Sequence, residues 1–271
     1  MNRQSRRWLG VRAEWLVLAI MLGMTTWTAR ADDGGGSSVA ESKAPIPIDD
    51  VMRYSVSFAG IHCGTMTLQS FLDETNVDDP IYKIVMTART SKFFDSIYKV
   101  RTRIESFYSP KRMSSIRYHE HSREKSKVKD KLYVVDFGAS QVRKIEAGEE
   151  EIIPITTQHV YDPLSFLYRV RLLVSEPGDR VTLDMMTTGG DFATVAEVTG
   201  LSRISTPFGK REAIQVVPRP ANEVIFSKEG TMSVWLSHDD QRIPYRVEFE
   251  LDFGRLVAKL KEIDAGEENE P

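Results

Sequence analysis

The feature that most constrains the fold of this chain is a recurring alternation of apolar and polar residues with a period of two. In several segments every second residue is apolar, whereas its neighbours are mostly polar or charged. The alternating sets are Met52, Tyr54, Val56 and Phe58; Tyr82, Ile84, Met86 and Ala88; Tyr98, Val100, Thr102 and Ile104; Val181, Leu183 and Met185; Met232, Val234 and Leu236; and Tyr245, Val247, Phe249 and Leu251. Successive side chains of a strand point to opposite faces, so the pattern predicts antiparallel strands with one buried face.

Turn-forming residues separate these segments, at 189–191 (G-G-D), 228–230 (K-E-G) and 252–254 (D-F-G). A sheet of so many strands must curl to bury one face, and curling also protects its edges. We therefore predict a mostly β protein. Its core is a single curved antiparallel sheet, or a half-closed barrel, of about ten or more strands.

One segment, 161–173, breaks the alternation and predicts a single short helix. Asp162 stands at the N-cap, and Pro163 takes the first helical position, where its missing N–H costs nothing. Apolar side chains cover most of the helix and leave a narrow polar stripe around Ser165 and Arg169. A short helix of this kind must be buried, so we predict that it packs on the concave face of the sheet.

The two ends of the chain differ in composition from the part between them. Residues 1–31 predict an export signal, because arginines precede an apolar run too short to span a bilayer, and a final A-R-A fits a cleavage site. Residues 32–48 predict a flexible linker rich in glycine and serine, and residues 263–271 an acidic tail. Residues 49–262 contain no second linker or repeat, so we predict a single β-rich domain.

Export by the general secretory (Sec) route is the favoured interpretation of the N-terminal segment. Residues 5–9 (S-R-R-W-L) also resemble a twin-arginine motif, but Arg12 and Glu14 interrupt the approach to the apolar run. A retained N-terminal anchor is the other alternative. We expect a periplasmic or otherwise exported protein with no transmembrane span after signal cleavage.

Removal of the signal makes the chain more acidic. The chain has 36 basic and 39 acidic residues, of which five arginines and Glu14 lie in residues 1–31, so the remainder has a formal charge of −7. This charge argues against nucleic-acid binding. The single cysteine, Cys63, has no partner for an internal disulfide, and we expect a small buried thiol rather than a reactive or metal-binding one. No sequence feature predicts a cofactor.

A polar motif near the C-terminus, W-L-S-H-D-D-Q-R-I-P at 235–244, predicts a turn between two strands. We expect Ser237 to hydrogen-bond the turn backbone and Arg242 to pair with Asp239 or Asp240. Pro244 is expected to keep the start of the following strand extended.

The same motif fits neither a calcium site nor a catalytic triad. A calcium loop needs oxygen ligands at alternating positions over about a dozen residues, and here they stop after two. Ser237 and His238 are neighbours, so in a strand they would point to opposite faces. We predict no catalytic residue and a non-catalytic protein. The alternative is a periplasmic hydrolase or metal-dependent enzyme whose site is assembled from scattered residues such as His119, Asp162 and Asp239.

His119 and His121 are weak candidates for a metal site. Their spacing in a predicted strand places them on one face, a geometry that suits zinc or copper. No third ligand is close in sequence, and His62 beside Cys63 could complete a site only if the fold brought the two strands together. A solvated strand face is the favoured interpretation, so no metal is predicted.

A basic stripe is the candidate ligand-binding surface. Cations occupy every second position of one segment: Arg123, Lys125, Lys127, Lys129 and Lys131. If the segment is extended, they line one face over roughly 27 Å at about 3.3 Å per residue. Such a stripe could bind anionic lipid headgroups or envelope glycans. The alternative is a polar hairpin balanced by Glu124 and Asp130.

Five segments in order resemble the bacterial family known as domain of unknown function 3108 (DUF3108), over roughly residues 50–262. They are Y-S-V-S-F-A-G-I-H-C-G-T-M-T-L (54–68), S-I-Y-K-V-R-T-R-I-E-S-F-Y (96–108), D-P-L-S-F-L-Y-R-V-R (162–171), S-T-P-F-G-K-R-E-A-I-Q-V (205–216) and W-L-S-H-D-D-Q-R-I-P (235–244). The motif residues with expected structural roles are Asp162, Pro163, Tyr168, Arg171, Gly209, Trp235, Ser237, Asp239, Arg242 and Pro244.

The resemblance implies an exported, mostly antiparallel β protein of the envelope, with an architecture similar to that of periplasmic lipoprotein carriers, which wrap a curved sheet around a helix. It implies no established activity, so no family catalytic residues are carried over. Together these patterns predict a non-catalytic cell-envelope protein that binds a lipid, glycan or protein partner, and no nucleic acid, through its curved sheet.

Overall fold

The computed structural model describes residues 48, 51–73, 80–187, 190–221, 231–251 and 254–264. The predicted export signal lies outside these residues. So do the predicted linker apart from Ile48, residues 265–271 of the predicted tail, the predicted turn at 228–230, and parts of the predicted turns at 189–191 and 252–254.

Within the described residues the chain forms fifteen strands and two helices. The strands are β1 (Val51–Phe58), β2 (Ile61–Asp73), β3 (Ile81–Thr90), β4 (Val100–Ser109), β5 (Ser114–Glu124), β6 (Lys127–Asp136), β7 (Gln141–Glu146), β8 (Glu149–Pro154), β9 (Val160–Tyr161), β10 (Arg180–Thr187), β11 (Gly190–Thr206), β12 (Gly209–Pro220), β13 (Thr231–Ser237), β14 (Pro244–Leu251) and β15 (Gly254–Asp264). The helices are α2 (Lys92–Tyr98) and α3 (Pro163–Leu173).

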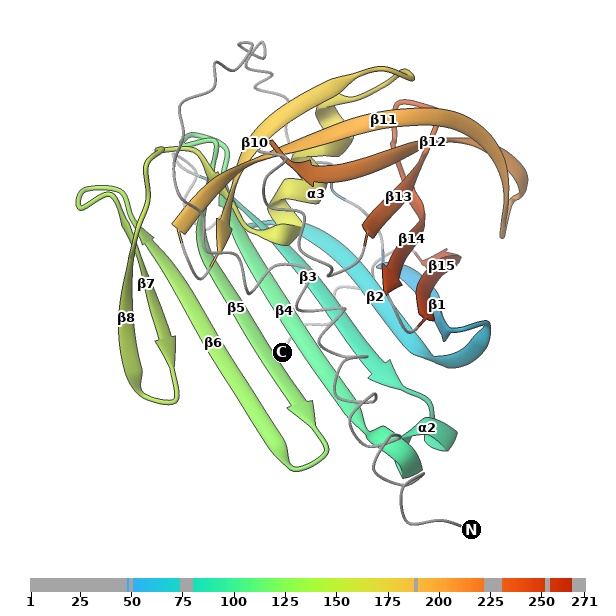
Figure 1. Ribbon diagram of the computed structural model, residues 1–271, viewed down its shortest axis with the longest axis horizontal. Coiled ribbons are helices and arrows are strands. Elements are labelled where there is room, and N and C mark those ends of the chain that lie inside the picture. Colours follow the sequence, from blue (N-terminus) through green and yellow to red (C-terminus); the bar gives the residue numbers. More distant parts are fainter. Residues whose placement is uncertain are drawn as a thin grey trace.

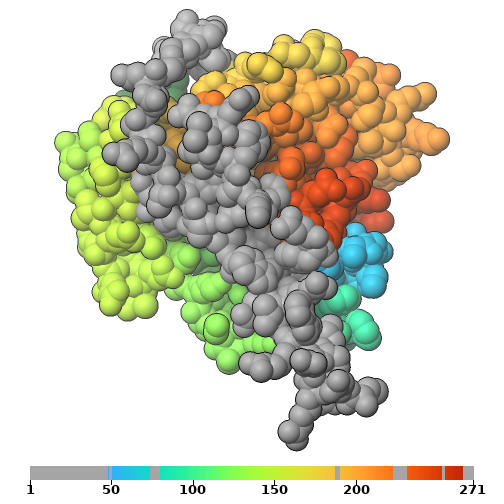
Figure 2. Space-filling view, viewed as in Figure 1, coloured from blue at the N-terminus to red at the C-terminus, as the bar shows by residue number. Residues whose placement is uncertain are grey.

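All of these strands belong to one sheet, in the order β8-β7-β6-β5-β4-β3-β2-β1-β15-β14-β13-β12-β11-β10-β9. Neighbours pair antiparallel, except that the short β9 pairs parallel with β10. Figure 1 shows the sheet curving around α3, and Figure 2 shows β6 to β8 in yellow-green and β11 to β15 in orange to red on opposite sides of one face. The predicted curved, mostly antiparallel sheet with a short helix on its concave face is confirmed.

The two edges of the sheet are partly joined, so the sheet is half closed. Thr156, just after β8, donates its N–H and its Oγ1 to the Asp191 carboxylate on β11, at 2.7 Å each. Ser114 on β5 hydrogen-bonds the main-chain N–H (3.1 Å) and C=O (3.0 Å) of Val160 in β9. Register shifts in five strand pairs, among them β4–β5 and β13–β14, add the local twist that this curvature requires.

The hydrophobic core fills the concave side, where inward-facing side chains of the sheet meet α3. Strand β1 shows the predicted alternation, since Met52, Tyr54 and Val56 are buried and Arg53 is exposed. Tyr54 is among the largest fully buried side chains, and its phenolic O–H donates to the main-chain oxygen of Pro244 at 2.8 Å. The apolar face of the period-two pattern is therefore the core.

Strand β2 contains a glycine and a cysteine whose roles depend on close packing. A Cβ atom added at Gly64 would collide with the main-chain oxygen of Arg89 on β3, so only glycine fits this position. The Cys63 thiol is buried and donates to the main-chain oxygen of Val56 at 3.5 Å. Burial raises the pKa of Cys63 to about 11. The expected small buried thiol is confirmed.

Helix α2 was not predicted. Ser91 caps it by accepting from the N–H of Phe94, and Asp95 forms an ion pair with Arg101 on β4 at 2.6 Å. Tyr98 is the last residue of α2, and the strand that was predicted to include it begins two residues later, at Val100. In the sequence Tyr98 continues the apolar alternation of β4, because its side chain is buried like the inward residues of that strand.

The last strand reaches Asp264, which pairs with Val51 of β1, so residues 263 and 264, which were predicted to belong to the acidic tail, are part of β15. In the described part of the chain, neither helix is long and apolar enough to cross a bilayer.

Candidate functional site

Helix α3 begins at a buried carboxylate whose two oxygens are both hydrogen-bonded. Oδ1 of Asp162 accepts from the main-chain N–H groups of Leu164 (2.9 Å) and Ser165 (3.1 Å). Oδ2 accepts from the hydroxyls of Ser106 on β4 (2.5 Å) and Ser115 on β5 (2.7 Å). The predicted N-cap is confirmed, and the same side chain also ties the helix to the sheet.

Ser115 and Ser165 complete this contact, which we call the serine anchor (Asp162, Ser106, Ser115 and Ser165). Their hydroxyl oxygens lie 2.6 Å apart, and that of Ser115 also accepts from the N–H of Asp162 at 3.0 Å. Burial raises the pKa of Asp162, and the hydrogen bonds from Ser106 and Ser115 act against that rise. Ser165, in the polar stripe of the helix, is thus fully buried and bonded to the sheet.

The C-terminal half of α3 is held by a buried arginine. Arg171 donates from Nε to the main-chain oxygen of Arg242 (2.8 Å) and from Nη2 to that of Gln241 (3.0 Å). Its guanidinium carbon lies 4.7 Å from the centroid of the Tyr168 ring. A buried cation without such partners would cost several kcal/mol. This arginine clasp fastens α3 to the loop between β13 and β14.

The loop returns the contact through Arg242. Its Nε donates to the main-chain oxygen of Val174, just past α3, at 3.1 Å, and its Nη1 donates to the main-chain oxygen of Asp239. This corrects the predicted pairing of Arg242 with the carboxylate of Asp239 or Asp240. The Asp239 carboxylate instead accepts from Ser237 and from main-chain N–H groups of the loop, so no carboxylate is needed to hold the arginine.

Ser237 stabilises the turn as predicted. Its buried hydroxyl donates to Oδ1 of Asp239 at 2.6 Å and accepts from the N–H of Ile243 at 2.8 Å. β14 begins at Pro244, whose main-chain oxygen accepts from the hydroxyl of Tyr54, the first residue of the motif at 54–68. Three segments far apart in sequence, around residues 54, 171 and 242, therefore meet at this loop.

The scattered residues of the enzymatic alternative are not brought together. His119 lies on the outer face of β5, whereas Asp162 lies beneath α3 on the inner face and Asp239 lies in the β13–β14 loop. His238, which follows Ser237 in the sequence, contacts Glu176, with its Nε2 3.1 Å from Oε1 of that residue. These residues form no common site.

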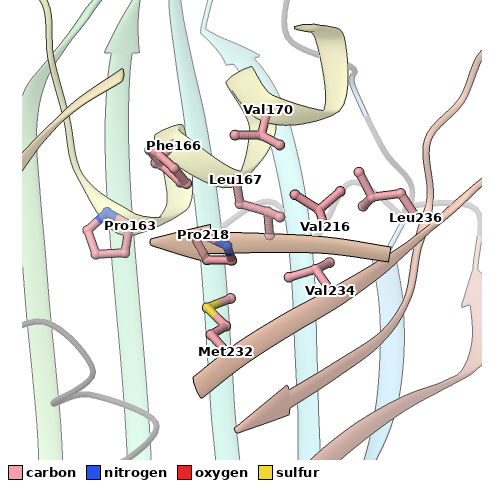
Figure 3. A pocket seen from close by; sticks show the side chains of 9 residues that line it. All are labelled: Pro163, Phe166, Leu167, Val170, Val216, Pro218, Met232, Val234 and Leu236. Carbon is pink, nitrogen blue, oxygen red and sulfur yellow. The ribbon is translucent and has the colours of Figure 1, made fainter. Parts of the chain in front are cut away.

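A small apolar cavity lies between α3 and strands β12 and β13. Its volume is about 30 Å³, roughly the share of one water molecule in the liquid. Figure 3 shows the lining side chains, which come from α3 and from β12 and β13. The lining residues are all apolar: Pro163, Phe166, Leu167, Val170, Val216, Pro218, Met232, Val234 and Leu236.

His119 and His121 share one face of β5, as predicted, and both contact a single carboxylate on β6. Nε2 of His119 lies 2.7 Å from Oδ1 of Asp130, and Nδ1 of His121 lies 3.0 Å from Oδ2. Hydrogen bonds from these histidines lower the pKa of Asp130. His62 is bonded elsewhere, with Nδ1 3.0 Å from the Ser55 hydroxyl. Among the residues that the structure describes, no cluster of three or more His, Cys, Asp or Glu has a metal-binding arrangement.

The predicted basic stripe is wrong as a single surface. Lys125 lies in the turn of the β5–β6 hairpin, so the segment reverses direction instead of remaining extended. Arg123 pairs with Val128 on the outer face, whereas Lys127 pairs with Glu124 on the inner face. The alternation of cations in the sequence spans two strands and two faces.

Two of the five cations are also neutralised. Lys129 forms an ion pair with the buried Glu124 at 3.0 Å, and Lys131 lies 3.9 Å from Glu146. The balancing role proposed for Glu124 is therefore seen, whereas Asp130 binds the two histidines instead. Only the cations at the hairpin tip remain as candidates for a binding surface.

Trp235 and Gly209 occupy other parts of the sheet. In the sequence of β13, Trp235 lies between two buried residues and is itself half-buried. The guanidinium carbon of Arg246 lies 4.9 Å from the centroid of its ring. Gly209 has a positive φ of 90° at the β11–β12 turn, where its main-chain oxygen accepts from Thr206 at 2.8 Å. Both residues support the sheet and not the helix.

The sheet side of the serine anchor was missed in the sequence. Ser106 is a small polar residue at an inward position of β4, whose other inward residues are mostly apolar, whereas the buried residues of β5 around Ser115 are mostly polar. Only Ser106 was therefore a departure from an apolar alternation. That departure was the available signal, but the pattern does not show which partner a buried hydroxyl will bind.

A half-closed antiparallel sheet around one anchored helix defines a β-barrel-like protein. The chain belongs to the family described as "Protein of unknown function (DUF3108)", whose model matches residues 53–261. The resemblance inferred from the five motifs is thereby confirmed.

Two solved structures are similar in fold. One is a β-barrel-like protein of domain of unknown function DUF1849 from Brucella abortus, with a TM-score of 0.54 and 8% identity, covering 81% of this chain and 98% of that one. The other is a DUF1089 family protein from Pseudomonas aeruginosa, with a TM-score of 0.38 and 11% identity, covering 80% of this chain and 95% of that one. No curated protein matches the chain. The likeness to the first structure supports the β-barrel-like fold alone.

Proposed function

We propose that the protein is an exported, non-catalytic binding protein of the cell envelope, and that it holds an apolar chain between α3 and the concave face of β12 and β13. The chain would be the acyl part of a lipid or an apolar segment of a partner protein.

The apolar cavity beside α3 carries this proposal. Binding sites for small molecules are concave and mostly apolar, and they lie between packed elements. A bound chain needs more room than the roughly 30 Å³ present, so side chains at the cavity must move. Leu167 and Met232 line the cavity and are only half-buried, which makes them the side chains best placed to give way.

The polar residues of the motifs support a non-catalytic role. Asp162, Arg171, Ser237 and Asp239 each use their side chains to bind other groups of this chain. A general acid, base or nucleophile must instead be within reach of a substrate. The motif residues therefore support an architecture in which α3 is held at both ends with an apolar middle.

Export is supported by the order of arginines, apolar run and A-R-A in residues 1–31. Mass spectrometry of the protein from its native host should find a chain that begins at Asp32 in the periplasmic fraction. An intact N-terminus in the cytoplasmic or membrane fraction would contradict export.

The binding site is tested by titrating the protein with a fluorescent long-chain fatty acid. Met232→Trp should weaken binding at least about tenfold, because the larger side chain fills the cavity. Leu183→Trp is the matched control, since Leu183 is also half-buried at the core but does not line the cavity. Every variant keeps the same N-terminal segment, so any binding to that segment cancels. Equal affinity in all three proteins would refute the site.

A further inference from the structure

Helix α2 exposes two large apolar side chains on one face. Phe93 is 71% exposed and Ile97, one helical turn later, is 53% exposed. The opposite side of the helix is held to the sheet, since Phe94 packs against the core and Asp95 forms the ion pair with Arg101. These apolar side chains are therefore displayed by a fixed element.

The tip of the β5–β6 hairpin lies against this helix. The N–H of Lys125 donates to the main-chain oxygen of Lys99 at 2.9 Å, and its Nζ lies 4.7 Å from the centroid of the Tyr98 ring. Arg123 and Lys127 flank the tip and are exposed. We call this surface the α2 rim (residues 92–99 and 123–128).

The α2 rim has an uncompensated positive charge. Its exposed cations are Lys92, Lys99, Arg123, Lys125 and Lys127, and in the described residues none of the five forms an ion pair. Its two acidic residues are both paired. Asp95 binds Arg101, and the buried Glu124 binds Lys129 at 3.0 Å and the Tyr98 hydroxyl at 3.1 Å. The rim is therefore cationic in a chain whose formal charge is −3.

We propose that the α2 rim docks on the surface of an anionic lipid bilayer. Exposed aromatic and aliphatic side chains surrounded by cations fit the boundary between headgroups and acyl chains. Phe93 and Ile97 enter that boundary, and the five cations contact lipid phosphates. Val128, 54% exposed beside Arg123, widens the apolar part. This surface lies away from the cavity beside α3, so the inference does not depend on the proposed function.

The charge contribution is tested by co-sedimentation of the full chain with vesicles of equal parts phosphatidylglycerol and phosphatidylcholine. Each cation near an anionic surface contributes roughly a fivefold change in binding, so the triple variant Lys92→Gln, Lys125→Gln and Lys127→Gln should bind about 100-fold more weakly. The control replaces the exposed Lys210, Lys259 and Lys261 by Gln, with the same change in charge and no expected loss. Equal weakening by both triple variants would overturn the proposal.

The apolar contribution is tested with Phe93→Ser combined with Ile97→Ser. Because both side chains are exposed, the double variant should fold and melt like the parent but bind the same vesicles at least about tenfold more weakly. The control changes Leu201 and Phe208, which are 45% and 46% exposed on β11 and at the β11–β12 turn, to Ser. If only the charge variant lost binding, the rim would be an electrostatic surface for an acidic partner, and membrane docking would be wrong.

Discussion

The arginine clasp gives the sharpest prediction about stability. Arg171→Met puts a long apolar side chain in the buried site of the arginine. It removes the donors that reach the main-chain oxygens of Gln241 and Arg242. Each hydrogen bond from a charged donor contributes roughly 1.5–3 kcal/mol. Stacking of the guanidinium on Tyr168 adds roughly 0.5–2 kcal/mol.

Methionine recovers part of this loss through apolar burial, so we expect unfolding to become easier by about 3–5 kcal/mol. A domain of this kind has a total stability of only about 5–15 kcal/mol. The change should therefore be plain in a urea unfolding curve, as a lower midpoint with an unchanged slope.

Two further variants make the assay decisive. Arg203→Met, at an exposed position, should change stability by less than about 0.5 kcal/mol. Arg242→Met removes the reciprocal bond to Val174, so the double variant with Arg171→Met should be non-additive by about 1 kcal/mol or more. If Arg171→Met cost less than about 1 kcal/mol, the clasp would not hold the helix. Our account of how the motifs at 162–171 and 235–244 bind each other would then be refuted.

Three other changes test separate contacts. Leu167→Asp places a charge in the apolar cavity beside α3 and should destabilise the protein by about 2–4 kcal/mol in the same urea assay; an unchanged curve would show that the helix is not packed there. The hydrogen bond from Arg101 lowers the pKa of Asp95 from 3.8 to about 2, so the stability from this pair is present above the unfolded-state pKa and is lost as pH falls towards 2. Asp95→Asn should therefore remove that part of the acid-induced loss of melting temperature, and a variant whose pH profile paralleled that of the parent would contradict the assignment. Gly64→Ala forces a Cβ against the main chain of Arg89 and should cost about 1–3 kcal/mol, whereas the same change at the unobstructed Gly200 should cost less.

Much of the fold could be predicted because the alternation of apolar and polar residues within a strand shows which of its faces is buried. Met52, Tyr54 and Val56 alternate with polar neighbours, and this was enough to place β1 and its buried face. The α3 boundary was also local, since Asp162 binds N–H groups only two and three residues away. Helix α2 was missed because its seven residues are few and its buried Tyr98 continues the alternation of β4.

The candidate site could be predicted only in part. The polar motif at 235–244 was correctly interpreted as a turn, and Ser237 has the role expected of it. The partner of Arg242 was not predicted, because the main-chain oxygen of Val174 is 68 residues away in sequence. The basic stripe failed for a related reason: an alternating pattern does not reveal that Lys125 sits in a turn.

The sequence by itself determined helix α3 and the strands with a clear alternation, together with their buried faces, because strand periodicity and helix capping depend on neighbours within a few residues. Only the tertiary structure decided how the elements meet: which serines bind Asp162, which carbonyls bind Arg171, and which cations share the α2 rim with Phe93. Those contacts join residues tens of positions apart. Their geometry is set by the curvature and register of the whole sheet, which no single segment encodes.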